Sequence, residues 1–379
     1  MSENQTFIKD IPQDIYRKLQ QHLDTLPIGY PPTESGTDLK ILKFIFTPEE
    51  ALIWINLRLI PEPLKTIYRR LKKYGITLEQ LKIVLKKMYK NGAINLKRVE
   101  GEKGEEIYYH NAFLAVGMYE YQLHRMDAEF YETFEQYMDE VFRDEVASTK
   151  INQLRTIPVE QSITPEHDIA TFDELKNLIE NANRIAVQDC VCRQGKDLLG
   201  KPCKQSDLRE VCFVLDSSVQ HILDNEKGRE ISKKEALEIF KKIQEAGLII
   251  QPGNALSPNF ICSCCGCCCD MITNIKKLDR PADMMHSNFY AEVDVESCIG
   301  CGTCEQHCQL DAISIEDGIA VVSKDLCIGC GNCTTTCTEE AIMLKKKGEE
   351  FIPVKSKTEL YLKIMHKKAE LRRKEKGLE

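Results

Sequence analysis

Two short stretches of the sequence repeat one spacing of cysteines: CIGCGTCEQHC at residues 298–308 and CIGCGNCTTTC at residues 327–337. In each stretch the first three cysteines are separated from one another by two residues. Three further residues separate the third cysteine from a fourth. Each stretch continues into a similar phrase, QLDAISIEDG after the first and TEEAIMLKKKG after the second. The two halves therefore look like copies of one small unit.

This spacing is typical of thiolate ligands to an iron–sulfur cluster. Three cysteines in a tight loop supply three thiolates to one [4Fe–4S] cluster, and the fourth cysteine, beyond the loop, binds the other cluster. Glycines in the loops let the backbone approach a cluster and aim N–H groups at its sulfurs. They are Gly300, Gly302, Gly329 and Gly331. Two adjacent clusters of this kind form an electron relay.

The duplicated region, residues 288–345, resembles the bacterial two-cluster ferredoxins, whose cysteine spacing it matches at all eight positions. The resemblance implies electron transfer and two sets of ligands. One set is Cys298, Cys301, Cys304 and Cys337, and the other is Cys327, Cys330, Cys333 and Cys308. The sequence departs from that family after each fourth cysteine, where Gln309 and Thr338 replace the usual proline. The departure leaves the ligands intact but changes the turn.

A second set of ten cysteines lies upstream, six of them in the stretch ICSCCGCCCD at residues 261–270. The set is Cys190, Cys192, Cys203, Cys212, Cys262, Cys264, Cys265, Cys267, Cys268 and Cys269. Zinc sites commonly use CxxC pairs, often with histidine, and the CxC and CC pairs here match that pattern poorly. A multi-iron cluster presents several metal corners close together, so neighbouring thiolates can reach different irons. We therefore expect iron–sulfur ligation.

The grouping of these ten cysteines stays open between several arrangements. In an extended segment, alternate side chains point to opposite sides. One side would hold Cys262 and Cys264 with Cys267 or Cys269, and the other would hold Cys265 and Cys268. The stretch then bridges two clusters or wraps one unusual cluster that needs more than four thiolates. Alternatively, one ordinary cubane is completed by Cys190, Cys192, Cys203 and Cys212.

We expect one or two additional clusters in this region, of cubane or non-cubane type. Several cations lie near these cysteines in the sequence and are suited to balancing an anionic cluster. They are Arg193, Lys196, Lys201, Lys204 and Arg209.

Composition and charge narrow the class of protein. The chain has 379 residues and a formal net charge of -8, which argues mildly against a dedicated nucleic-acid binder. The N-terminus has no apolar region of a signal peptide, and no stretch approaches 18 uninterrupted apolar residues, so we expect a cytoplasmic protein. Disulfides are rare there. Eighteen cysteines, all between Cys190 and Cys337, therefore indicate metal ligands.

Residues 38–150 are predicted to form a helical domain with one hairpin. Capping boxes at Thr47–Glu50 and Thr77–Gln80 begin two helices, a helix from Pro63 to Gly75 lies between them, and residues 93–110 alternate like a hairpin. This order resembles a winged helix over about residues 38–112, followed by a long amphipathic helix. DNA is a possible ligand, but the glutamate-rich hairpin VEGEKGEEI makes a protein partner the better expectation.

The fold class expected is α+β with several domains. We expect an N-terminal arm (1–37), the winged-helix-like domain with its helical extension (38–150), an extended linker, a cysteine-rich domain (168–287), the ferredoxin domain (288–345) and a basic helical tail (346–379). No phosphate-binding loop or dinucleotide fingerprint is present in the sequence.

The whole resembles the multi-cluster ferredoxin-domain proteins of anaerobes. That resemblance implies an electron carrier or redox subunit working with a partner oxidoreductase, rather than a stand-alone enzyme. One alternative is a redox-sensing regulator that reads cluster state through the winged helix. A second alternative is a reductase that acts on a small substrate at an upstream cluster.

Overall fold

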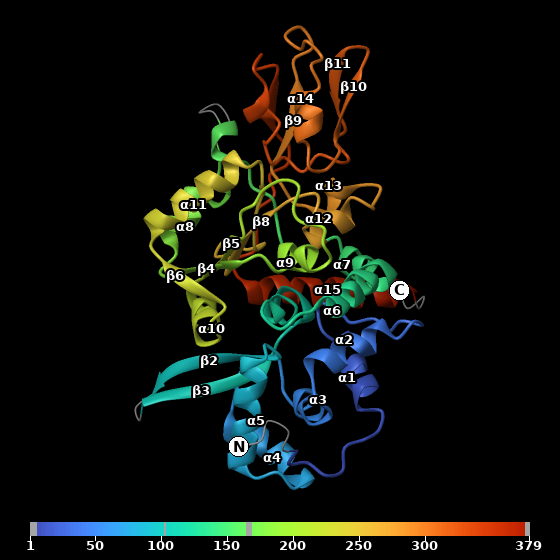
Figure 1. Cartoon of the computed structure of the whole chain (residues 1–379), viewed down its shortest axis with the longest axis vertical. Helices are drawn as coiled ribbons and strands as arrows, with labels where there is room; N and C mark the ends of the chain where they lie inside the picture. The colour runs from blue at the N-terminus through green and yellow to red at the C-terminus, as the bar shows by residue number, and fades with distance from the viewer. Residues whose placement is uncertain (1–5, 102–103, 164–168, 376–379) are drawn as a thin grey trace. The chain divides into compact units, whose positions relative to one another are not determined.

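The computed structural model describes residues 6–101, 104–163 and 169–375, and the chain divides into two compact units, Met1–Glu145 and Val146–Glu379. Both units mix helices with antiparallel strands (Figure 1). Within the described ranges, no helix has the length and apolar character needed to cross a membrane.

Three helices open the first unit: α1 (Ile15–Asp24), α2 (Thr37–Ile45) and α3 (Pro48–Ile55). Helix α1 packs against α2 and α3 and buries Leu19 and Leu23. The predicted capping box of α3 is present, because the Thr47 hydroxyl accepts from the Glu50 N–H and the Glu50 carboxylate accepts from the Thr47 N–H. The capping box thereby gives hydrogen-bond partners to two backbone N–H groups that the helix itself leaves unpaired.

A small sheet and two helices complete the core of this unit. The elements are β1 (Glu62–Pro63), α4 (Leu64–Leu71), a 3-10 turn (Lys72–Tyr74), α5 (Leu78–Lys90), β2 (Ile94–Gly101) and β3 (Gly104–Asn111). The antiparallel sheet has the order β1-β3-β2. The second capping box, at Thr77 and Gln80, is also present. Strand β1 was not predicted from the sequence, because two residues carry no readable alternation.

The long amphipathic helix predicted over residues 118–145 is present only from Ala128 onward. After turns at Leu114–Met118 and Glu120–Gln122, helix α6 (Ala128–Tyr137) continues through a π-helical turn (Met138–Phe142) into α7 (Arg143–Ala147). The interruption occurs at Asp127, whose side chain accepts from the Phe130 N–H at 2.8 Å. Asp favours such a capping position over a helix interior, so it begins a new helix here.

The second unit is built on a five-stranded antiparallel sheet of order β6-β4-β5-β8-β7 (Figure 1). Helices α8 (Leu175–Asn181) and α11 (Lys233–Glu245) share one apolar core with this sheet, and α10 (Val219–Asp224) packs in a separate cluster with Ala186 and Val214. The strands are β4 (Ile185–Asp189), β5 (Glu210–Leu215), β6 (Gly228–Ile231), β7 (Ile249–Pro252) and β8 (Phe260–Cys264).

The register of this sheet decides which way its cysteines point. Val187, Phe213 and Ile261 lie side by side on adjacent strands and belong to the core under α8 and α11. Because successive side chains alternate between faces, the cross-strand pair Cys212 and Cys262 points to the other face. The strand thiols Cys212 and Cys262 thus lie on the face of the sheet away from the α8 and α11 core.

The remaining helices, turns and strands of the second unit precede or follow β8 in the sequence. Helix α9 (Val191–Leu198) follows β4 directly, and 3-10 turns occupy Glu160–Ser162, Thr171–Asp173 and Asp216–Ser218. After β8 the chain forms α12 (Asp270–Ile275), α13 (Pro281–Met284), β9 (Phe289–Val293), α14 (Thr303–His307), β10 (Ile313–Glu316), β11 (Ile319–Val322), a 3-10 turn (Thr334–Thr336), β12 (Ile342–Lys346) and α15 (Lys357–Glu375).

The segment predicted as an extended linker is extended but lies inside the second unit. Leu154, Arg155 and Ile157 form isolated bridges with Gly253, His286 and Ile250, and Ile157 is fully buried. The prediction of a free linker is therefore wrong over residues 151–159. Its apolar residues gain more from burial against the sheet edge than from exposure to solvent. Residues 164–168 of the expected linker lie outside the described part of the chain.

A buried ion pair connects this segment to the ferredoxin-like end of the chain. The Arg155 Nη1 lies 2.7 Å from Asp173 Oδ1, and the two side chains are 1% and 5% exposed. Asn288 donates to the second Asp173 oxygen at 2.7 Å and exchanges hydrogen bonds with the backbone of Phe351. Burial raises the pKa of Asp173 and lowers that of Arg155 to about 10, so desolvation opposes both charges.

We predict that Asp173→Ala destabilises the second unit by about 3–5 kcal/mol, because it leaves the Arg155 charge buried without its carboxylate. The double variant Arg155→Met, Asp173→Leu removes both charges and should recover most of that loss. Anaerobic urea unfolding of the full chain measures both effects. An equal loss of unfolding free energy in the single and double variants would contradict this account of the ion pair.

Candidate metal centres

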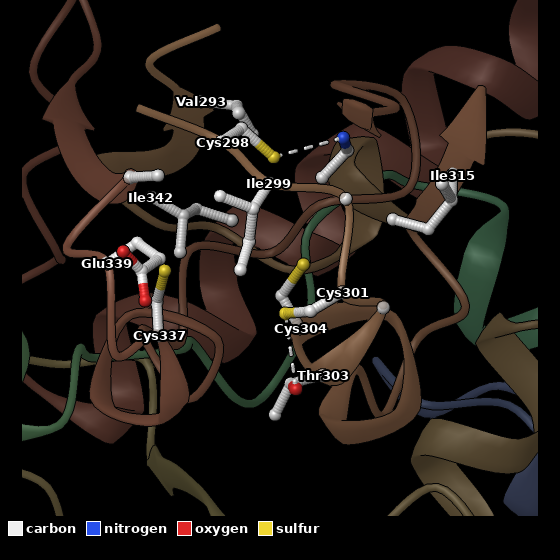
Figure 2. A pocket seen from close by; sticks show the side chains of 14 residues that line it. Val293, Cys298, Ile299, Cys301, Thr303, Cys304, Ile315, Cys337, Glu339 and Ile342 are labelled. Carbon is white, nitrogen blue, oxygen red and sulfur yellow. Dashed lines mark hydrogen bonds between the residues drawn. The ribbon is translucent and has the colours of Figure 1, made fainter. Parts of the chain in front are cut away.

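The eight cysteines of the duplicated region lie around two hollows. The first hollow is lined by Cys298, Cys301 and Cys304 from the loop before and within α14, and by Cys337 from the second half of the repeat. Figure 2 shows these four cysteines with the apolar walls Ile299 and Ile342. The fourth cysteine of the second loop thus faces the hollow of the first.

The second hollow has the reciprocal arrangement. It is lined by Cys327, Cys330 and Cys333 from the second loop and by Cys308 from the first. The grouping of thiols around each hollow is the crossed one that the resemblance to two-cluster ferredoxins implies.

The backbone of both loops approaches the thiols closely. Gly300 and Gly329 have φ of +65° and +66°, and a Cβ on either would lie 2.0 Å from the Gly318 oxygen or 2.2 Å from the Phe289 oxygen. Only glycine fits these turns. Backbone N–H groups point at the sulfurs: Ala320 donates to Cys298 at 3.5 Å, Ala291 to Cys327 at 3.4 Å and Ala312 to Cys308 at 3.2 Å.

The two hollows differ in their access to solvent. Cys301 of the first is exposed, and the neighbouring Ile299 is 66% exposed. In the second, burial raises the pKa of Cys330 to about 12, so this thiol ionises only where a metal cation compensates the lost hydration. The first hollow is therefore the more exposed of the two.

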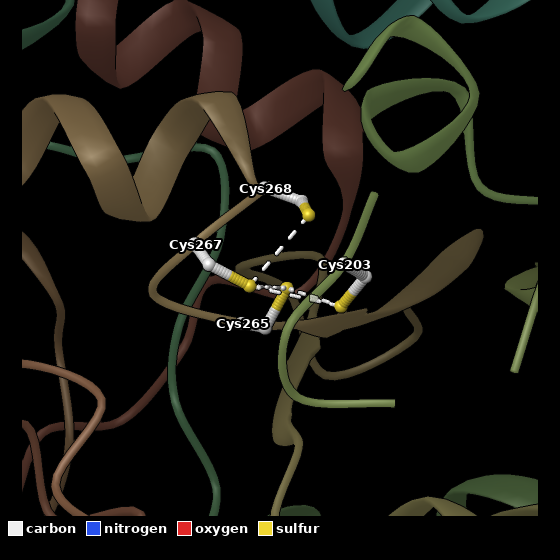
Figure 3. Close-up of side chains that lie close together, drawn as sticks. All are labelled: Cys203, Cys265, Cys267 and Cys268. Atoms are coloured by element: carbon white, nitrogen blue, oxygen red, sulfur yellow. Dashed lines mark hydrogen bonds between the residues drawn. The ribbon is translucent and has the colours of Figure 1, made fainter. Parts of the chain in front are cut away.

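The ten upstream cysteines, all free thiols, separate into two groups. One group, called here the four-thiol site, comprises Cys203, Cys265, Cys267 and Cys268. Figure 3 shows Cys203 on one loop and the other three on the loop after β8, with their side chains turned toward one another. The sulfur of Cys267 lies 3.6 Å from those of Cys265 and Cys268, and the sulfur of Cys203 lies 3.7 Å from those of Cys265 and Cys267.

The other group, called here the six-thiol row, forms a chain of thiol contacts. It comprises Cys212, Cys262, Cys264, Cys269, Cys192 and Cys190, in the order in which each thiol bonds to the next. Cys212 and Cys262 are cross-strand partners, Cys264 follows on the same face of β8, and the sulfurs of Cys264 and Cys269 are 3.2 Å apart. Cys190 and Cys269 are the N-cap residues of α9 and α12.

This division differs from one arrangement expected from the sequence. Cys190, Cys192, Cys203 and Cys212 do not come together, because Cys203 lies with the loop after β8 and the other three line the row. The alternation predicted for an extended segment places Cys262 and Cys264 apart from Cys265 and Cys268, as in the structure. Of the two residues left open, Cys267 joins the four-thiol site and Cys269 joins the row.

Arg193 is a buried cation between the two groups. Its side chain is 1% exposed, its Nη1 donates to the Leu208 carbonyl at 2.7 Å, and its Nε and Nη2 have no oxygen or nitrogen acceptor among the described residues. Although burial opposes the charge, the neighbouring Cys190, Cys265 and Cys203 thiolates raise the pKa of Arg193. A buried guanidinium beside sulfur is suited to balance an anionic metal centre.

Three of the other cations named from the sequence do not share this position. Arg209 pairs with Asp197 at 2.8 Å, and Lys201 and Lys204 are exposed. Among these residues, the structure therefore favours Arg193 as the internal counter-charge.

Gln309, the residue in place of the usual proline, connects the duplicated region to the upstream cysteines. Its Oε1 accepts from the Gly266 N–H at 2.8 Å, and its backbone oxygen would lie 2.3 Å from a Cβ at Gly266. Gly266 stands between Cys265 and Cys267 of the four-thiol site. Sequence reasoning noted the departure at Gln309 but could not predict this contact, which joins residues 43 positions apart.

The six-thiol row adjoins the second hollow through a shared apolar core. Cys264 and Cys269 belong to a buried cluster with Ile249, Ile328 and other apolar residues, and Cys308, Cys327 and Cys330 pack against the same cluster. Nearby, the Val159 N–H donates to the Cys330 carbonyl and Asn332 donates to the Gly247 carbonyl at 2.7 Å. The duplicated region is thus docked on the sheet through its second loop.

Comparisons with known proteins agree with the chemistry of the duplicated region. Residues 291–314 and residues 319–342 each match a family model described as a 4Fe-4S binding domain. No curated protein and no solved structure matches the chain. Each matched segment contains four cysteines and a tight turn that only glycine fits. The residues present therefore fit two [4Fe–4S] clusters.

We predict that each fourth cysteine controls the cluster of the opposite loop. Cys308→Ser should perturb the paramagnetic signal of the cluster held at 327–333, because Cys308 lines that hollow. Cys337→Ser should perturb the cluster held at 298–304. Paramagnetic spectra of the two reduced variants make the comparison, with unmodified protein as control. Damage confined to the loop that contains the substituted cysteine would contradict crossed ligation.

Proposed function

We propose that this protein relays electrons between a partner oxidoreductase, its two ferredoxin-type clusters and at least one further iron–sulfur cluster on the six-thiol row. A bound iron–sulfur cluster accepts and releases single electrons, and the protein fixes its potential through ligands, hydrogen bonds and burial. The observation that carries the proposal is the apolar core shared by the six-thiol row and the second hollow.

The shared core supports a continuous route through the second unit. Cys308, Cys327 and Cys330 approach this core from the second hollow, and Cys262, Cys264 and Cys269 from the row. Apolar packing keeps water away from both places, which limits the reorganisation that accompanies electron transfer. The first hollow shares Cys304 and Cys337 with a neighbouring core that also contacts Cys308 and Cys327. The three centres therefore form a series from the surface inward.

The linear shape of the six-thiol row supports a multi-iron cluster. Its thiols follow one another along strands β5 and β8 and the starts of α9 and α12, instead of meeting at one point. Different irons of a cluster take different thiolates, so a spread of ligands suits several metal ions better than one. Six thiolates exceed the four that an ordinary cubane uses, which favours a non-cubane or linked cluster here.

The charge of the duplicated region indicates the kind of partner. Residues 288–345 contain ten Asp and Glu against two Lys. Exposed Ile299 and Glu339 line the first hollow, and the exposed Val295 and Glu296 shortly precede Cys298 in the chain. We propose that a partner with a basic face docks here and exchanges electrons with the first cluster. We place this exchange in the cytoplasm, where thiols stay reduced.

The further cluster is tested by iron and acid-labile sulfide on anaerobically purified protein. We expect at least about twelve irons in the full chain, about eight of them in the ferredoxin-type clusters. Cys264→Ser should lower iron and sulfide toward about eight while both ferredoxin-type signals persist.

The matched control is Ser263→Ala, one residue away on β8. Because side chains alternate along a strand, Ser263 lies on the opposite face from Cys264, so this variant should retain all of its iron. An unmodified chain that holds about eight irons, or equal iron in all three proteins, would refute a cluster on the row.

A second candidate function rests on the first unit. The order α3, β1, α4, α5, β2, β3 with a β1-β3-β2 sheet supports the winged-helix assignment, and Lys82, Lys86 and Lys90 are exposed on α5. Those lysines favour a redox-sensing regulator that contacts phosphates. Glu100, Glu105 and Glu106 are exposed on the hairpin, where they would repel a DNA backbone. We therefore propose a protein partner for this unit.

We predict no specific DNA complex from the first unit. Mobility-shift assays with the gene's own promoter, using oxidised and reduced protein, should show no salt-sensitive specific shift, because the hairpin glutamates oppose phosphate contact. Lys86→Glu serves as the control, since it removes an exposed cation from α5 and should leave the result unchanged. A specific shift that depends on the oxidation state and disappears in Lys86→Glu would establish the regulator instead.

A further inference from the structure

The sulfur–sulfur spacing in the four-thiol site is that of ligands to a single ion. Zinc binds thiolates at about 2.3 Å in a tetrahedron, which places neighbouring sulfurs about 3.8 Å apart. The four measured separations, among Cys203, Cys265, Cys267 and Cys268, are 3.6 to 3.7 Å. All four sulfurs lie within 4.8 Å of one another. The site therefore has the number, type and separation of ligands that one tetrahedral ion requires.

The ferredoxin-type hollows provide an internal comparison. Thiolates bound to different irons of a cubane point outward from separate corners, so they stand farther apart than thiolates on one ion. Across the described residues, the four-thiol site is the one group of three or more ligand-type side chains whose ligand atoms all lie within 4.8 Å of one another. The ferredoxin-type cysteines, all within the described ranges, instead line two hollows, and no three of them meet that limit. One structure thus contains two different ligand geometries.

The surroundings of the four-thiol site are those of a closed, anionic metal centre. Cys203, Cys265 and Cys268 are buried and Cys267 is half-buried. Backbone N–H groups of Gln205 and Ser206 donate to the Cys203 sulfur, and the buried Arg193 lies against Cys265 and Cys203. Four thiolates on a divalent ion carry a net charge of about −2, which these donors and the guanidinium offset.

We propose that Cys203, Cys265, Cys267 and Cys268 bind one zinc ion in a structural site. Four protein thiolates leave no open position, so the ion serves the fold and not the redox chemistry. It fastens the loop between α9 and β5 to the loop after β8, which Cys264 and Cys269 of the six-thiol row flank. This inference does not rest on the proposed electron relay, and it differs from the iron–sulfur ligation expected from sequence for these four residues.

Zinc, iron and acid-labile sulfide measured together on the anaerobically purified full chain test this site. We expect about one zinc per chain, reduced to a trace in Cys267→Ser, with iron and sulfide unchanged. Cys301→Ser, in the first ferredoxin loop, is the matched control and should lose iron and sulfide while keeping its zinc. This pattern separates the zinc site from the proposed clusters, because each substitution removes a different element.

A second measurement covers the case in which Cys267→Ser fails to fold. Cobalt exchanged into the unmodified chain in place of zinc should give the visible absorption of a tetrahedral thiolate site. Loss of about four irons with matching sulfide in Cys267→Ser would show a cubane at the site and overturn the proposal. The proposal would equally fail if the unmodified chain held no zinc and gave no tetrahedral cobalt spectrum. Loss of one iron without sulfide would overturn the choice of zinc.

Discussion

Mutual repulsion between buried thiolates is the constraint on which the second unit depends. Eighteen cysteines lie between Cys190 and Cys337, seven of them are buried, and several upstream thiols contact one another. Burial disfavours a charged thiolate, and a second thiolate nearby disfavours it further. Metal cations reverse both effects, and metal binding to such thiols is generally coupled to folding. The backbone N–H groups of Ala291, Ala312 and Ala320 and the buried Arg193 fit the same requirement, because they bring N–H dipoles and positive charge to the sulfurs.

The local parts of these sites could be predicted because they follow from short-range geometry. The spacing of eight cysteines identified two clusters, and the two matched 4Fe-4S binding segments agree with it. Strand alternation separated Cys262 and Cys264 from Cys265 and Cys268, and the structure divides them in the same way. Alternation ends where β8 ends at Cys264, so it could not place Cys267 and Cys269, which lie in the turn before α12.

The tertiary parts could not be predicted from a single sequence. Cys203 reaches the loop after β8 because β5 pairs with β8, and nothing in the local pattern reveals that pairing. The contact of Gln309 with Gly266 and the burial of Arg155 with Asp173 likewise join distant segments. The long helix predicted over residues 118–145 was placed about ten residues too early for the opposite reason, since its apolar periodicity concealed a local cap at Asp127. The packing of the duplicated region against the sheet decides whether electrons can pass between clusters. It is thus the feature that the sequence predicts least well.

The central claim is that a cluster on the six-thiol row exchanges electrons with the second ferredoxin-type cluster. An anaerobic redox titration of the full chain, followed by electron paramagnetic resonance, tests it most directly. Spins on neighbouring clusters interact, so the fully reduced protein should show a spectrum broadened by at least three coupled centres. Cys264→Ser should reduce it to the interaction of two. Identical spectra in both proteins, explained by two clusters alone, would contradict the relay.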